Sequence, residues 1–216
     1  MVDYQLLNKQ LAALLAGETD ALANSANFVG LLYAGLPDIS WLGIYVLRGN
    51  EIVLGLFQGQ PACVRIPLGH GVCGIAAEKA ATQRVDDVRS FAGHIACDPV
   101  SASEIVVPLL MRGRLVGVLD IDSPTLSRFG SEDQRGVEAL CKNFLLHLEN
   151  GSSDSAIFYL TLDTYSPVRV STFTSSPCST NNGTRTTAPV DSTAGLTPPS
   201  AVSPNLPHAR STPHRP

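Results

Sequence analysis

Apolar residues recur at helical spacing at both ends of a region that covers the first two thirds of the chain. Leucines fall three and four residues apart over residues 6–15, and Gly17 follows where that helix would end. A second helical stretch covers residues 22–33, with Thr19 as its expected N-cap. A third begins at Ser131 and carries one apolar stripe: Val137, Leu140, Cys141, Phe144, Leu145 and Leu148.

Between these helices the pattern changes to that of strands. Two pairs of apolar runs are each joined by a short turn that contains Gly, which is typical of β-hairpins. The four runs cover residues 41–47 and 51–57, then 104–111 and 115–122. A short helix over 72–79 and a brief strand over 83–85 are also predicted.

Hairpins supply most of the predicted strands, so the expected sheet is mainly antiparallel. The helices from the two ends of the region should pack together on one face of that sheet. The other face is then left to the loop-rich middle of the chain, residues 60–103. This is an α+β fold, and a pocket enclosed between the sheet and these loops is the natural place for a small ligand.

Charge and hydropathy exclude several classes of function. The chain has a net charge of −4, and its residues 1–150 hold 11 Lys and Arg against 16 Asp and Glu. Such a region lacks the basic patch that nucleic acids and anionic membranes require. No apolar run approaches the roughly 18 residues of a transmembrane helix, and no secretory signal is visible after Met1. We therefore expect a cytoplasmic protein that binds neither nucleic acid nor membranes.

Composition changes sharply after residue 150. Ser, Thr and Pro occupy 32 of the 66 positions from 151 to 216, and Lys is absent. A segment of this kind buries too little apolar surface to offset the entropy lost on ordering. We predict one folded domain, residues 1–150, followed by a disordered tail, residues 151–216.

Three cysteines, Cys63, Cys73 and Cys97, lie within thirty-five residues of the loop-rich middle. A thiolate serves as nucleophile, redox centre or metal ligand. Where thiols are kept reduced, clustered cysteines are more often catalytic or metal-binding than structural. Their spacings lack a Cys-x-x-Cys knuckle, which disfavours a zinc site made of these cysteines and a histidine. Cys141 falls on an apolar helical stripe and is expected in the core.

Acidic and aromatic residues are placed to surround these thiols. Asp120 and Asp122 are two apart on one predicted strand, so both side chains point to one face, and Glu104 begins the neighbouring strand. Repulsion between facing carboxylates raises the pKa of one of them, which then acts as a proton donor, and such a pair also attracts an ammonium group. Trp41 and Tyr45, four apart on the first strand, likewise share a face.

Six short runs that contain these residues carry a resemblance to a known family. They cover residues 41–45, 57–66, 69–74, 93–98, 103–109 and 117–123. In them the chain resembles the free methionine-(R)-sulfoxide reductases, a family built on the GAF fold. The resemblance implies a GAF-like domain that reduces the (R)-epimer of free methionine sulfoxide to methionine.

The resemblance also implies roles for the three thiols. Cys97 would attack the substrate sulfur and become a sulfenic acid, and Cys63 is the first choice to resolve that acid as a disulfide. Cys73 is the competing resolver, or a relay, and the attacking role itself stays open between Cys97 and Cys73. Thioredoxin is the implied reductant, and no cofactor or metal is expected.

The family pattern further implies which residues hold the substrate. Glu104, Asp120 and Asp122 would bind the substrate and exchange protons. Trp41 would enclose the methyl end of the substrate, and Tyr45 would donate to an acid or to the sulfoxide oxygen. From loop geometry, the backbone amides around Ile95, Ala96 and Cys97 are the candidate donors to the substrate carboxylate. A homodimer is expected by analogy with other proteins of this fold. The rival interpretation is a GAF module that binds a small molecule without catalysis.

Overall fold

A computed structural model describes residues 2–93, 95, 97 and 100–151. The predicted tail beyond residue 151 lies outside the described residues. A six-stranded antiparallel sheet has the strand order β3-β2-β1-β6-β5-β4. In chain order the strands are β1 (Trp41–Arg48), β2 (Glu51–Gln58), β3 (Arg65–Pro67), β4 (Gln83–Val85), β5 (Ser103–Met111) and β6 (Arg114–Ser123). The antiparallel sheet is confirmed, and β3 is a strand where the sequence indicated only a loop.

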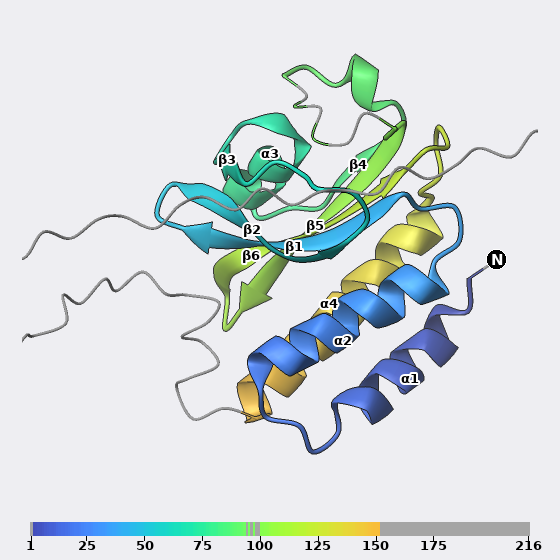
Figure 1. The fold of residues 1–216 in the computed structure, drawn as a ribbon, viewed down its shortest axis with the longest axis vertical. Coiled ribbons are helices and arrows are strands. Elements are labelled where there is room, and N and C mark those ends of the chain that lie inside the picture. The colour runs from blue at the N-terminus through green and yellow to red at the C-terminus, as the bar shows by residue number, and fades with distance from the viewer. Residues whose placement is uncertain (1, 94, 96, 98–99, 152–216) are drawn as a thin grey trace, which may run out of the picture. The chain divides into compact units, whose positions relative to one another are not determined.

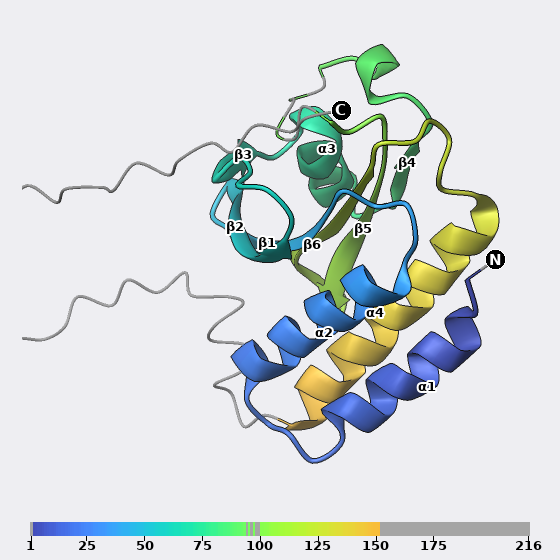
Figure 2. The same ribbon diagram turned by 45° about the vertical axis from the view of Figure 1, so that its right-hand side comes forward.

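Three long helices cover one face of the sheet, as predicted (Figure 1). They are α1 (Tyr4–Leu15), α2 (Ala21–Gly35) and α4 (Ser131–Gly151). The opposite face carries the short helix α3 (Gly71–Lys79) and the 3-10 turn η1 (Val88–Ser90), as the turned view in Figure 2 makes clear. None of the described helices is long and apolar enough to cross a membrane.

Acidic side chains fix where the first two helices begin. The Asp3 carboxylate accepts from the Leu6 N–H at 2.9 Å, and the Asp20 carboxylate accepts from the Ala23 N–H at 2.8 Å. Each of them satisfies an N–H group that has no partner inside the helix. The prediction of Thr19 as the cap of α2 is therefore wrong by one residue. Both residues are capping types, and the sequence alone does not distinguish them.

Alternation along the strands separates two apolar clusters. Leu42 and Ile44 of β1 face the helices, whereas Trp41 and Tyr45 face the side of α3. On the helix side, the rings of Phe28 and Phe144 stack with centroids 4.2 Å apart, and both are fully buried. This cluster joins all three long helices to the sheet and leaves the other face to the loops.

Removal of one of these stacked rings should destabilise the domain. We expect Phe144→Ala to lower the free energy of unfolding by about 3–5 kcal/mol, because the ring leaves a cavity among fully buried neighbours. Leu146→Ala is the matched control, since this residue of α4 is 46% exposed. Urea unfolding followed by circular dichroism measures both, and equal losses in the two variants would contradict this placement of the core.

Candidate functional site

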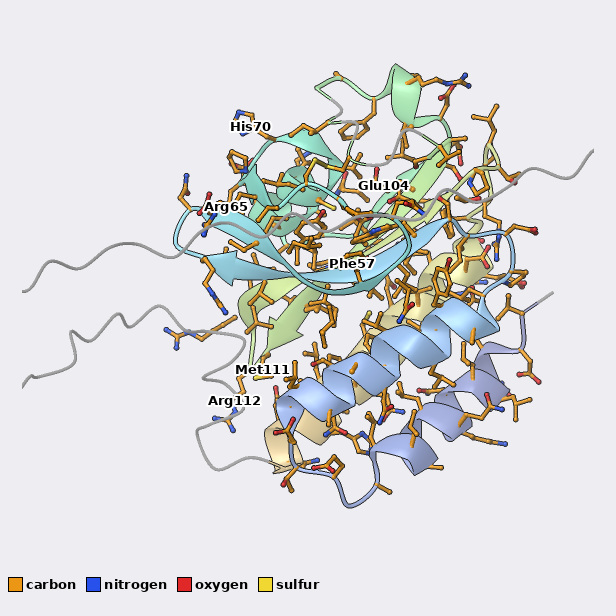
Figure 3. All side chains as sticks on the ribbon, viewed as in Figure 1. Phe57, Arg65, His70, Glu104, Met111 and Arg112 are labelled. Atoms are coloured by element: carbon orange, nitrogen blue, oxygen red, sulfur yellow. A yellow bond between two sulfur atoms is a disulfide. The ribbon has the colours of Figure 1, made fainter. Side chains whose placement is uncertain are left out.

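Three carboxylates from two neighbouring strands meet on the sheet face that carries α3. Glu104 of β5 is the direct cross-strand partner of Asp122 of β6, and Asp120 lies two residues away on the same face. The three residues are 6%, 8% and 6% exposed, in that order. All of them line one cavity, and Figure 3 shows Glu104 on the sheet face turned away from α2. The predicted convergence of the acids is confirmed.

Burial makes Asp120 and Glu104 difficult to ionise. It raises the pKa of Asp120 to about 6. Burial and, after it, repulsion by Asp120 and Asp122 raise the pKa of Glu104 well above its ordinary value. None of the described residues that line the cavity carries a positive charge. The site therefore favours the protonated form of Glu104, or attracts a cation from outside the protein.

A disulfide links Cys63 and Cys97 beside the acids. The two Cα atoms lie 5.1 Å apart although the residues are 34 positions apart in the chain. Cys97 and Ile95 line the cavity, and both bonded cysteines are half-buried. The Cys97 N–H donates to the Ile95 carbonyl at 2.9 Å, so in this state that amide is not available to a ligand. The amide of Ala96 lies outside the described residues.

Cys73 sits in the first turn of α3 and is 4% exposed. Its thiol donates to Glu104 Oε1 at 3.7 Å. Burial, followed by the nearby charges of Asp120 and Glu104, raises the pKa of the Cys73 thiol well above its ordinary value. Because the thiolate is the reactive form, this environment disfavours Cys73 as a nucleophile.

Close backbone packing brings α3 over the acids. At Gly74, a Cβ atom would lie 2.3 Å from the Pro67 carbonyl oxygen, a distance at which a side chain cannot be accommodated. Gly71, where the helix begins, has a φ of +63°, which glycine adopts without the usual steric cost. The two glycines thereby allow the helix to deliver Cys73 to the cavity.

Trp41 and Tyr45 share a face, as predicted, but the residues lining the cavity do not include them. Trp41 Nε1 donates to the Gln60 carbonyl at 2.9 Å, and the Tyr45 hydroxyl donates to the Cys63 carbonyl at 3.0 Å. In the disulfide-linked state the pair therefore holds the segment that carries Cys63. Their contact with substrate stays a prediction.

Ser101 joins the site although no sequence pattern indicated it. Its hydroxyl donates to Asp122 Oδ1 at 2.6 Å and lines the same cavity. The cavity measures only about 20 Å³, which is room for about one water molecule. With the disulfide formed, the acids are closed off from any ligand as large as an amino acid.

Ionisation of Glu104 should cost stability as the pH rises. Its folded-state pKa lies above the unfolded value of 4.5, so above that pH the folded state binds more protons and the free energy of unfolding falls. We expect Glu104→Gln to remove a pH dependence of up to about 1.4 kcal/mol per pH unit. Urea unfolding of the oxidised protein over a pH series measures this. The control is Glu132→Gln, whose side chain is 68% exposed; parallel curves for wild type and Glu104→Gln would contradict the raised pKa.

Comparisons with known proteins agree with this geometry. The GAF domain family matches residues 9–148. The free methionine-R-sulfoxide reductase of Escherichia coli is 53% identical over 137 residues, which make up 63% of this chain and 83% of the relative. The fRMsr of Staphylococcus aureus in complex with substrate is 47% identical, with a TM-score of 0.66 over 68% of this chain and 97% of that one.

The X-ray structure of free methionine-R-sulfoxide reductase from Neisseria meningitidis in complex with its substrate is 41% identical. Its TM-score is 0.66, over 68% of this chain and 89% of that one. Fold and sequence therefore agree over the region that holds the disulfide and the acids. The chain belongs to the free methionine-(R)-sulfoxide reductase family of GAF-domain proteins.

Proposed function

We propose that the protein reduces free L-methionine (R)-S-oxide to L-methionine with Cys97 as the attacking thiol. The single observation that carries this proposal is the position of Cys97, which lines the cavity of the three acids and is bonded to Cys63. A nucleophile, a resolving partner and proton donors therefore lie within one site.

The proposed reaction proceeds in three steps. The Cys97 thiolate attacks the sulfoxide sulfur while a proton is supplied to the sulfoxide oxygen. The hydroxyl then passes to the Cys97 sulfur as its bonds to the substrate sulfur break, so that methionine leaves and Cys97 becomes a sulfenic acid. The Cys63 thiol then condenses with the sulfenic acid, so that an S–S bond forms and water is released. A dithiol finally reduces the disulfide and is itself oxidised.

Glu104 is our proposed proton donor. A carboxylic acid that keeps its proton near neutral pH can supply it to an oxygen that is otherwise a poor leaving group. The burial and repulsion that raise the pKa of Glu104 favour this role. Cys73 is a weaker candidate for either redox role than Cys63, because its thiol is buried against Glu104 and its pKa is raised.

Asp120 and Asp122 are proposed to bind the substrate ammonium. Asp120, Asp122 and Glu104 lie close together in one small cavity, so a cationic group on the ligand would balance the ionised carboxylates. Free methionine sulfoxide carries that group, as does a residue at the N-terminus of a peptide. Residues within a peptide lack it, which supports free methionine sulfoxide as the substrate.

Thioredoxin is the proposed reductant. The Cys63–Cys97 bond lies between half-buried residues, and Val64, next to Cys63, is 62% exposed. A dithiol on another protein can therefore approach the bond from the loop side. The reducing cytoplasm supplies such a partner.

A homodimer is the proposed assembly.

Two cysteine substitutions distinguish the attack on the sulfoxide from the later recycling of the enzyme. Cys97→Ser should abolish methionine formation, because a hydroxyl cannot take the sulfoxide oxygen. Cys63→Ser should still form about one methionine per chain and then cycle slowly with thioredoxin. Cys141→Ser is the control, since this buried thiol lies on the other side of the sheet. Burst and steady-state assays of methionine measure all three, and wild-type cycling of Cys63→Ser would exclude it as the resolving thiol.

Neutralising an acid should weaken substrate capture. We expect Asp122→Asn to raise KM by about 10- to 100-fold, because an amide loses a charge-assisted contact with the ammonium group while keeping the shape of the side chain. Asp86→Asn serves as a control carboxylate that does not line the cavity. Steady-state kinetics with the free (R)-epimer give both values, and an unchanged KM would remove Asp122 from the site.

A further inference from the structure

One thiol and two carboxylates in the cavity are arranged as metal ligands. Cys73 Sγ, a Glu104 oxygen and an Asp120 oxygen all lie within 4.8 Å of one another, and all three residues are buried. In a tetrahedral zinc site, metal–sulfur and metal–oxygen bonds of about 2.3 and 2.1 Å place sulfur and oxygen about 3.6 Å apart. The Cys73 Sγ to Glu104 Oε1 distance is 3.7 Å.

A second observation also points to a ligand at this place. Asp120 Oδ1 is buried and has no hydrogen-bond partner. A buried carboxylate oxygen without a partner is costly unless a ligand or a proton satisfies it. The described residues that line this cavity include no Lys, Arg or His.

We propose that the protein, in the state with the Cys63–Cys97 disulfide, binds one divalent transition-metal cation of the zinc class between Cys73, Glu104 and Asp120. The cavity of about 20 Å³ excludes an amino acid but has room for a single ion. The site differs from the three-cysteine zinc site that the spacing disfavours, because Cys63 and Cys97 are bonded to each other and take no part.

The donor set selects the class of cation. A thiolate with two carboxylates suits zinc or cobalt, whereas magnesium and calcium take oxygen ligands only. On binding, the Cys73 S–H bond and the Glu104 O–H bond break, both protons pass to solvent, and metal–sulfur and metal–oxygen bonds form. No electron is transferred, so no oxidant or reductant is required.

This site stands independently of the proposed reaction. If both exist, they share Glu104 and Asp120, so a zinc-class cation and the substrate ammonium compete for the same carboxylates. A bound cation would then keep the cavity of the oxidised enzyme closed to a ligand as large as an amino acid.

Cobalt(II) titration of the full-length oxidised protein tests the proposal. We expect one Co²⁺ per chain, with a thiolate-to-cobalt charge-transfer band in the near ultraviolet and the visible bands of tetrahedral cobalt. Cys73→Ser should abolish the charge-transfer band and weaken binding by at least about 100-fold. This loss is larger than that caused by removing a residue that only hydrogen-bonds to a metal ligand. Asp120→Asn keeps the thiol and should weaken binding with the band retained at saturation.

Matched controls exclude other ligands. Cys141→Ser and Cys178→Ser remove the remaining thiols and should leave the band and the affinity unchanged. Binding to histidines elsewhere in the chain would lack the sulfur band. Absence of this band in the wild-type protein overturns the proposal whatever the folding of the variants, and so does its persistence in Cys73→Ser that retains the wild-type circular dichroism.

Discussion

Burial of three carboxylates side by side in one small cavity is the constraint on which this site depends. The ladder between β5 and β6 fixes the side chains of Glu104, Asp120 and Asp122 on one face, so they cannot separate to relieve their repulsion. The protein therefore holds a proton there or accepts a cationic ligand. The ammonium of a free amino acid and a zinc-class cation would each balance the negative charge of these carboxylates.

One face of the sheet packs against the long helices and stabilises the domain, and the other face carries the candidate site. On the helix side, the stacked rings of Phe28 and Phe144 belong to a cluster that joins α1, α2 and α4 to the strands. On the other side, Tyr45 extends from β1 to hold the backbone at Cys63. A rigid sheet thus presents the acids, while a hydrogen bond between a strand and a loop positions one half of the redox pair.

Much of this architecture could be predicted from periodicity. The two hairpins, the helices at both ends and the shared face of Asp120 and Asp122 follow from local spacing, because a strand alternates and a helix repeats. Local patterns do not encode which loops meet. The pairing of Cys63 with Cys97, across 34 positions, came from the family resemblance and not from spacing.

Other parts of the site were not predictable for the same reason. Ser101 reaches Asp122 only because the loop before β5 folds back onto β6. The hydrogen bond from Trp41 to the Gln60 carbonyl also depends on loop geometry, whereas the family resemblance implied that Trp41 encloses the substrate. β3 has only three residues and is stabilised as a strand by its pairing with β2, which is a tertiary contact.

The most direct test of the central claim, that buried acids hold a free amino acid beside Cys97, is a thiol count on reduced enzyme. Free methionine (R)-S-oxide should consume two thiols per chain, and peptide mapping should find Cys63 joined to Cys97. The α-N-acetylated (R)-sulfoxide, which lacks the ammonium group, should consume none on the same timescale. Equal rates of thiol loss with the two compounds would contradict the account.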